Sequence, residues 1–275
     1  MQRLESGRPR SAVSDPEVEV AVLGPVEIRG VAQPFCRASS RELVAYLAFH
    51  RQGARSDVWA SALWTDRCIA PSTLHSTASA ARRALGRSRS GGEHLPRGGG
   101  RLRLADSVGT DVDRFARVAE GPEPDRWKDA LALVRGRPFE GLNLADWAVL
   151  DGTQAQLEAM VVGTALKAAE HFLRRGSGEE AEWVIRRGLR ANPYDERLYR
   201  GLLWAMEKMG NRAGMWSTMA ELRCLATDGG TRSEGLGPGT EGRMRQSCVH
   251  PTTTALFGEL IQRESPAARG EPSRL

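Results

Sequence analysis

Residues 71–86 constrain the fold more than any other stretch of the chain, because their side chains separate onto two faces at helical spacing. One face is apolar, and the other carries hydroxyl groups and one arginine. Such a small polar face lets a nucleic-acid groove approach closely, so the pattern favours a recognition helix, although many surface helices share it. The apolar face consists of Leu74, Ala78, Ala81 and Leu85, and the polar face of Ser72, Ser76, Ser79 and Arg83.

The segments around this helix predict a winged helix-turn-helix. A helical run over 40–51 and a second over 57–65, with Ser56 as its expected N-cap, precede the recognition helix. Two β-like segments, 94–97 and 101–104, follow it and are joined by glycines, which predicts a basic hairpin. Helix, helix, recognition helix and hairpin is the element order of a winged helix.

Alternating valines predict a small sheet before these helices. Val18, Val20 and Val22 form one expected strand, and Val26 and Ile28 form the second. The polar residues before and after the folded part have nothing to bury. They predict a disordered arm over 1–17 and a disordered tail over 265–275.

From Thr110 onward the periodicity predicts helices only. The longest helix is expected over about 153–175, and the glycine-rich stretch 227–250 is expected to be a long loop. A closing helix over 250–262 should pack through Leu256, Leu260 and Ile261.

A weak internal repeat in this half has nearly the period of tetratricopeptide (TPR) helix pairs. Stacked pairs of this kind make a surface that holds a peptide, a helix or another copy of the chain. The matching residues are Gly176 and Gly210, which lie 34 residues apart, and Ala181 with Gly214, Trp183 with Trp216 and Leu189 with Leu222, which lie 33 apart.

The ordered segments resemble a known family. ELVAYLAFH, ASALWTD, STLHSTASAARRALG and LPRGGGRLRL resemble, in order, the OmpR/PhoB-type winged helix of the SARP-like regulators of actinobacteria. The second half resembles their bacterial transcriptional activator domain (BTAD), a bundle of TPR-like helices. The resemblance covers about 18–264. It implies a mainly α chain, with a winged-helix domain over 18–106 and a TPR-like helical domain over 107–264.

The resemblance implies a DNA-binding transcriptional regulator, most simply an activator, and the lack of a membrane span and of a signal-peptide core predicts a cytoplasmic protein. Its expected partners are double-stranded DNA, and RNA polymerase or another protein held by the TPR-like half. A homodimer is a further expectation, and no cofactor is expected.

Hydroxyl and arginine side chains on the helix and the hairpin form the expected DNA interface. The side chains that point outward suit base edges, and they are Ser76, Ser79 and Arg83. Those that flank the exposed face suit phosphates, as in the resembling family, and they are Thr73, Thr77 and Arg82. The hairpin residues Arg97 and Arg101 suit a phosphate strand or a minor groove, and Ser72 stands at the start of the helix.

The charge distribution agrees with this assignment. Residues 1–105 carry 16 arginines against nine acidic residues, whereas the rest of the chain carries 23 basic against 25 acidic residues. The basic excess therefore lies in the expected winged-helix half, where a positive field favours phosphate backbones. Solubility and an arginine-rich codon bias are the simpler explanation of the same excess.

Enzyme and metal-site motifs are missing from the sequence. None of the three lysines stands in a Walker A pattern, and no G-x-S-x-G or H-E-x-x-H occurs. The four cysteines form no C-x-x-C pair, so we expect a reducing compartment without structural disulfides. Cys248 and His250 with distant partners are the one zinc site that remains open. We expect no catalytic, metal or cofactor residues.

One departure from the family keeps a second interpretation open. Ala80 stands where the relatives commonly have an arginine, and the loss of a bidentate base contact costs roughly 1–3 kcal/mol of discrimination. The alternative is a protein–protein interaction scaffold with a vestigial winged helix, as part of a larger membrane-associated chain. The sequence itself contains no apolar run long enough to span a membrane, and no signal-peptide core.

Overall fold

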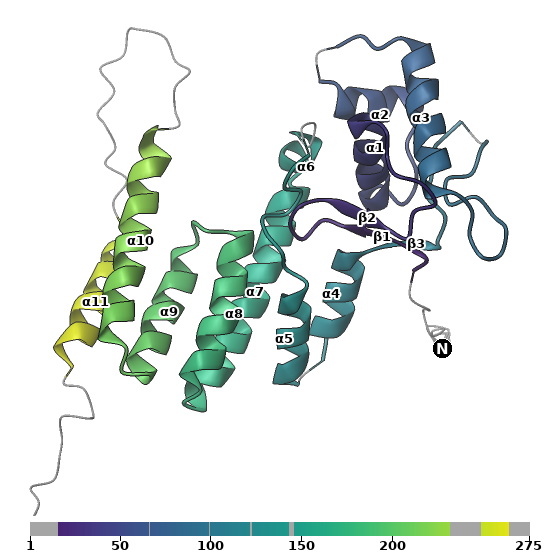
Figure 1. Ribbon diagram of the computed structural model, residues 1–275. Helices are drawn as coiled ribbons and strands as arrows, with labels where there is room; N and C mark the ends of the chain where they lie inside the picture. The colour runs from purple at the N-terminus through teal and green to yellow at the C-terminus, as the bar shows by residue number, and fades with distance from the viewer. Residues whose placement is uncertain are drawn as a thin grey trace, which may run out of the picture. The chain divides into compact units, whose positions relative to one another are not determined.

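The computed structural model describes residues 16–263, apart from residues 66, 99, 122, 143–145 and 232–248 (Figure 1). The expected arm over 1–17, except for its last two residues, and the expected tail over 265–275 lie outside this part of the chain. The fold class expected from the sequence is confirmed, because the chain is mainly helical with a small sheet near its N-terminus.

The chain divides into two compact units. The first contains Val26–Asp113 together with the described residues of Met1–Val22 and Gly141–Trp147. The second contains Leu23–Pro25 and the described residues of Arg114–Glu140 and Ala148–Leu275. The expected domain boundary at 106/107 stays a prediction.

A three-stranded sheet of order β2-β1-β3 belongs to the first unit. Strand β1 (Val18–Ala21) buries Val18, Val20 and Ala21 and lies in the centre, where both of its edges are paired. Strand β2 (Glu27–Arg29) runs antiparallel to it, and β3 (Val108–Thr110) runs parallel to it on the other side. The two strands near the N-terminus were predicted, whereas β3 was not.

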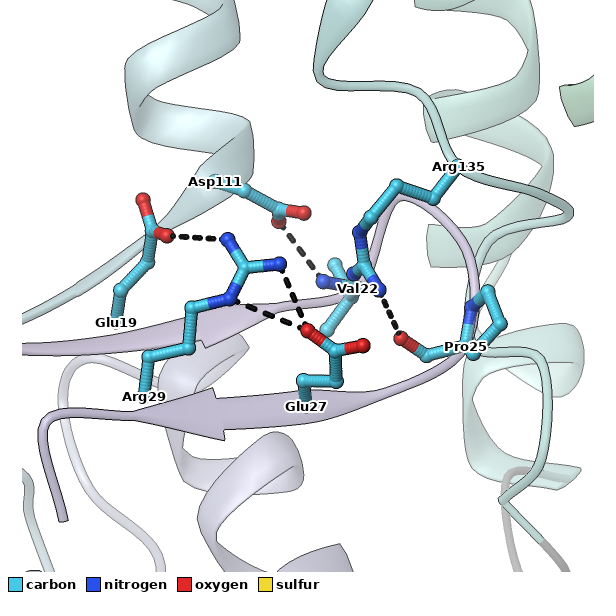
Figure 2. A network of polar contacts seen from close by, with 7 residues as sticks. All are labelled: Glu19, Val22, Pro25, Glu27, Arg29, Asp111 and Arg135. Atoms are coloured by element: carbon cyan, nitrogen blue, oxygen red, sulfur yellow. Dashed lines mark hydrogen bonds and ion pairs between the residues drawn. The ribbon is translucent and has the colours of Figure 1, made fainter.

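Polar contacts hold the sheet, as Figure 2 shows. The Arg29 guanidinium donates to Glu27 on its own strand at 2.7 Å and to Glu19 on β1 at 3.2 Å. The buried carboxylate of Asp111 accepts a hydrogen bond from the backbone N–H of Val22 at 2.8 Å. A buried hydrogen bond to a charged acceptor stabilises by roughly 1.5–3 kcal/mol, and an exposed ion pair by about 1 kcal/mol at most. Asp111 therefore matters more to the sheet than Arg29.

Helices α1 (Ala38–Phe49), α2 (Ser56–Leu63) and α3 (Pro71–Leu85) complete the first unit. Their bounds confirm the three helices expected from periodicity. Helix α1 is the central one, since Leu43–Ala48 are buried and the helix packs against α3. Ser56 is not the N-cap of α2, because the helix begins at Ser56 and the capping position falls to Arg55 without a side-chain bond.

The hairpin expected after α3, which we call the wing (residues 93–106), is irregular. Within its described residues the regular strands expected over 94–97 and 101–104 do not form. Leu102 instead pairs with Ala54, through two backbone hydrogen bonds of 2.9 Å. Gly53, with φ of 74°, permits this approach, because a Cβ there would stand 2.7 Å from the Leu102 carbonyl oxygen.

The second unit consists of helices. The cut between the units falls inside two of them, α4 and α6. The helices of this half are α4 (Asp111–Ala119), α5 (Pro124–Ala132), α6 (Asp146–Leu150), α7 (Thr153–Arg174), α8 (Gly178–Ala191), α9 (Glu196–Lys208), α10 (Arg212–Thr231) and α11 (Pro251–Gln262).

Helices α7 to α10 pack side by side in chain order (Figure 1). Gly176 ends α7 and Gly210 ends α9, both with positive φ, and each precedes the next helix by two residues. Leu189 on α8 and Leu222 on α10, the expected repeat partners, are both buried. The structure thus confirms two helix pairs at the predicted period.

Two predictions for the C-terminal part were wrong in part. Helix α10 continues to Thr231, so the loop predicted over 227–250 does not begin at 227, and its remainder up to residue 248 lies outside the described residues. The packing face of α11 consists of Thr253, Phe257 and Leu260. The other predicted members, Leu256 and Ile261, are only half-buried.

Candidate nucleic-acid interface

Helix α3 presents a polar face to solvent, as its sequence pattern predicts. Ser72, His75, Ser79 and Arg83 are exposed at spacings of three and four residues, which places them on one side of a helix. The opposite face buries Ala78, Ala81, Ala84 and Leu85. His75 was not among the expected contacts, although its position in the pattern could have indicated it.

The first turn of α3 is open to an anion. Pro71 occupies the first helical position, and the N-cap residue Ala70 has no side chain that could accept a hydrogen bond. Ser72 and Thr73 are exposed at this end. Because helix N-termini carry partial positive charge, this turn suits a phosphate oxygen.

Arg37 joins this face from another element. Its guanidinium donates to the Ser76 hydroxyl at 2.9 Å, and that hydroxyl donates in turn to the Thr73 carbonyl at 2.9 Å. Arg37 is the exposed N-cap residue of α1 and lies 39 positions before Ser76. Sequence reasoning missed it because no local pattern links the two residues. Ser76 therefore positions a cation beside the exposed face.

Thr77 was wrongly expected to contact phosphate. Its side chain is buried against α1, with 1% of its surface exposed. The Ser40 hydroxyl of α1 donates to the Thr77 carbonyl at 3.3 Å. The helical pattern alone does not show which flank of a helix is covered by its neighbour.

Arg82, which was expected to contact phosphate, is half-buried and turned toward the wing, and its contact with phosphate stays a prediction. Its Nε donates to the Leu95 carbonyl at 2.8 Å and lies 3.6 Å from a carboxylate oxygen of Glu93. Burial lowers the pKa of Arg82, as does the nearby charge of Arg97, whereas Glu93 raises it. Arg82 fixes the base of the wing to α3.

The wing places arginines around an open tip. The Arg97 side chain is 77% exposed, and Arg101 is also exposed. A groove of about 370 Å³ lies beside them and is lined in part by Arg103. Arg103 is paired with Asp106 at 3.3 Å, whereas Arg97 is 3.9 Å from Glu93.

The base of the wing is held by buried groups. His94 is 2% exposed, and its Nδ1 lies 2.8 Å from the Ser107 hydroxyl. The His94 carbonyl accepts from the Ala105 N–H at 2.9 Å, and Leu95 and Leu104 are buried beside it. These contacts fix the base of the wing while its arginines stay in solvent.

The electrostatics of this surface favour an anion. Among the described residues, no carboxylate lies within 4.0 Å of Arg37, Arg83 or Arg101. All the expected site residues except Thr77 are exposed or half-exposed: Ser72, Thr73, Ser76, Ser79, Arg82, Arg83, Arg97 and Arg101.

The described residues hold no group of three or more His, Cys, Asp or Glu side chains arranged for a metal ion. Cys248, which the sequence left open as a zinc ligand with His250, lies outside the described part of the chain. No helix within the described ranges is both long and apolar enough to cross a membrane.

The second half of the chain matches a family. Residues 111–227 match the bacterial transcriptional activator domain. No curated protein sequence matches the chain. The match begins at the first residue of α4 and ends inside α10, so it covers the two TPR-like helix pairs.

The fold also has a solved relative. It is similar to that of EmbR from Mycobacterium tuberculosis, in a structure determined in complex with a low-affinity phosphopeptide. The TM-score is 0.57 at 20% sequence identity, and the similarity covers 90% of this chain and 65% of the EmbR chain. At this identity the likeness shows the fold. Together with the activator domain, it confirms the resemblance to SARP-like regulators that the sequence predicted.

Proposed function

We propose that this chain, which carries a bacterial transcriptional activator domain over residues 111–227 and has the fold of a SARP-like regulator, binds double-stranded DNA and regulates transcription. The observation that carries the proposal is the exposed face of α3, where Arg83 and Arg37 have no carboxylate partner among the described residues. Cations without nearby carboxylates create a local positive potential that attracts anions such as phosphates.

The contacts divide by chemistry. His75, Ser79 and Arg83 extend from the middle of α3 and suit base edges in a major groove. The first turn of α3 and the half-fixed Arg37 suit phosphates, which position the protein without reading sequence. The wing residues Arg97 and Arg101 suit a phosphate strand or the adjacent minor groove.

The TPR-like half supplies protein contact in this proposal. Stacked helix pairs form surfaces that hold peptides or helices. RNA polymerase, another protein and a second copy of the chain are its candidate partners. A dimer would place two copies of α3 on half-sites about one helical turn apart.

The experiment is a selection from genomic DNA. The purified chain is mixed with a pool of genomic fragments at low and at moderate salt, and the retained fragments are sequenced. Enrichment of a direct repeat or palindrome, with retention that falls as salt rises, is the expected result. Absence of retention at low salt would contradict the proposal and favour an interaction scaffold with a vestigial winged helix.

Ala80 decides how selective this binding is. It is half-buried at the edge of the exposed face, next to Ser79, and offers no hydrogen bond to a base. Retention of DNA without an enriched sequence would mean that the regulator takes its specificity from a partner.

A further inference from the structure

A continuous series of cations and aromatic rings runs across α5, α7 and α8 in the second unit. Lys167 lies over the ring of Trp127 at 4.4 Å, and Trp127 contacts His171 edge to face. His171 contacts Phe172 in the same way, with ring centroids 5.5 Å apart. Each ring in the series therefore touches the next group.

The series continues onto α8. Lys128 lies 5.7 Å from the Phe172 ring centroid and 5.9 Å from that of Trp183. The Arg187 guanidinium also lies over the Trp183 ring, 4.9 Å from its centroid. We call Lys128, Trp183, Arg187 and the exposed Arg190 the cation–aromatic surface.

The cations of this surface have no ion-pair partner among the described residues, a feature that they share with Arg175 and Arg223 of the same unit. Among the described residues, none of Lys128, Arg187 and Arg190 has a carboxylate within 4.0 Å. Arg186, on the same helix, pairs with Glu182 at 2.6 Å. Other paired cations of this unit are Arg126, Arg137, Arg174, Arg197 and Arg263.

The missing carboxylates carry an electrostatic cost. Arg187 and Arg190 are three positions apart on α8, where like charges repel. Burial, followed by the charge of Arg190, lowers the pKa of Arg187. Arg187 nevertheless stays in place, because its Nη1 donates to the Val134 carbonyl at 3.1 Å. Its position is fixed, while its charge lacks a carboxylate partner in the described part of the chain.

Helix packing explains the rings and leaves the charges unexplained. Trp183 and Phe172 would pack equally well beneath neutral side chains. Exposed cation–π contacts contribute only about 0.5–1 kcal/mol each. The gathered positive charge therefore points to an anionic ligand.

We propose that the cation–aromatic surface is a docking site for an acidic segment of a partner protein. The proposal rests on the part of the proposed function that gives the TPR-like half a protein partner. A peptide with carboxylates beside apolar side chains matches cations that alternate with rings.

A protein segment fits better than nucleic acid. Asp129 and Glu179 are exposed on α5 and α8, the helices that carry the surface. Residues 106–275 carry 25 acidic against 23 basic side chains. Because the net charge of this half is slightly negative, a long polyanion such as DNA gains little attraction there, whereas a short segment with a few acidic residues would contact only the surface.

The test uses the full chain and a short fluorescein-labelled peptide in which aspartate and glutamate alternate with leucine and phenylalanine. Fluorescence anisotropy measures its affinity, and the same peptide with asparagine and glutamine in place of its acids is the control probe. We expect saturable binding of the acidic peptide only. Lack of binding, or equal binding of both peptides, would overturn the proposal.

Variants locate the binding. The double variant Lys128→Gln with Arg187→Gln should bind the acidic peptide on the order of tenfold more weakly, because the surface then has two fewer half-buried cations to attract carboxylates. Arg190→Glu changes an exposed side chain and should weaken binding without affecting the fold. Arg186→Gln, which alters a paired arginine on the same helix, should bind as the original chain does. Equal affinities for all these proteins would overturn the assignment.

A DNA-retention assay on the same proteins separates the two proposals. Arg190→Glu should retain DNA as the original chain does, and peptide binding should persist in a variant that no longer binds DNA. If duplex DNA displaces the peptide from this surface, the surface is a nucleic-acid site and the docking proposal is wrong.

Discussion

Thr77 and Ser79 lie two positions apart on α3 in opposite surroundings. The Thr77 side chain is 1% exposed, and its hydroxyl oxygen has no hydrogen-bond partner among the described residues. Ser79 is exposed on the polar face. A buried hydroxyl that lacks a partner destabilises the folded state by roughly 1–3 kcal/mol. Two hydroxyls that look equivalent in the sequence therefore have different physical roles.

The variant Thr77→Val should raise the free energy of unfolding by about 1 kcal/mol, because valine has nearly the same shape and no polar group to bury. Its affinity for DNA should not change. Urea unfolding and DNA retention measure the two effects, and Thr73→Val, at an exposed site, is the matched control for stability. Loss of DNA binding in Thr77→Val with an intact fold would contradict the placement of this residue.

Asp195 illustrates a residue whose role depends on charge. Its Oδ1 accepts a hydrogen bond from the Arg197 N–H at 2.9 Å and so caps α9. Its carboxylate also pairs with the Arg197 guanidinium at 2.7 Å. The hydrogen bond from the Arg197 side chain is the largest influence and lowers the pKa of Asp195 below its usual value, while burial acts in the opposite direction.

The variant Asp195→Ala should lose about 1 kcal/mol of stability at neutral pH, which is the usual contribution of an N-cap. Because the folded pKa is lowered, this contribution is present above the unfolded pKa of about 3.9 and declines as the pH falls through the folded value. Urea unfolding of both proteins near pH 7 and near pH 3 tests this. A stability difference that does not shrink at the lower pH would contradict the account.

At the scale of elements, α3 and the wing act together through one side chain. Arg82 spans them, since it starts on the helix and donates to the Leu95 carbonyl of the wing. Its neighbour Arg83 is exposed. Adjacent arginines thus have different surroundings: Arg82 bonds the wing, whereas Arg83 lies in solvent, where the proposed contact with DNA requires it.

The variant Arg82→Ala should destabilise the chain by about 1 kcal/mol, since the Leu95 carbonyl no longer has this donor. DNA affinity should fall only slightly, because the buried residues His94, Leu95 and Leu104 still hold the base of the wing. If Arg82 does not neutralise a phosphate, the dependence of affinity on salt should stay the same. A smaller salt dependence in Arg82→Ala would show that this arginine contacts the DNA backbone.

Most elements could be predicted from the sequence, because helical periodicity is local. The bounds of α3 and α7 agree with the pattern to within a residue or two. The wing strands could not be predicted, because a stretch rich in Gly, Pro and Arg pairs through single bridges such as that of Leu102 to Ala54. Strand β3 was missed since its three residues carry no alternation of their own.

The candidate site could be predicted only in part, for a similar reason. Exposure of Ser79 and Arg83 follows from the helical pattern. The burial of Thr77 depends on where α1 lies, and the contact of Arg37 with Ser76 joins residues far apart in the chain. Such contacts are set by tertiary packing, which the periodicity of one helix does not contain.

At the scale of the whole molecule, the charge and the domains give the two halves different chemistry. Residues 1–105 carry the basic excess and contain α3 and most of the wing, whereas the activator-domain match begins at residue 111 in the acidic half. In the proposed account the first half binds DNA and the second binds protein. The chain covers 65% of the EmbR chain to which it is similar. DNA binding by the first half and protein binding by the second are therefore proposals.

The affinity of one duplex for the double variant Arg83→Ala with Arg97→Ala, measured across a range of salt concentrations, tests this account most directly. The control is Arg174→Ala. It removes one positive charge from the second unit, at an arginine that is paired with Glu170. The account predicts that the double variant binds the duplex more weakly. Its slope of log affinity against log salt should be smaller in magnitude, by about 0.9 for each phosphate that it no longer neutralises. The control should keep the affinity and the slope of the original chain. Unchanged affinity and slope in the double variant would contradict the assignment of α3 and the wing as the DNA-binding surface.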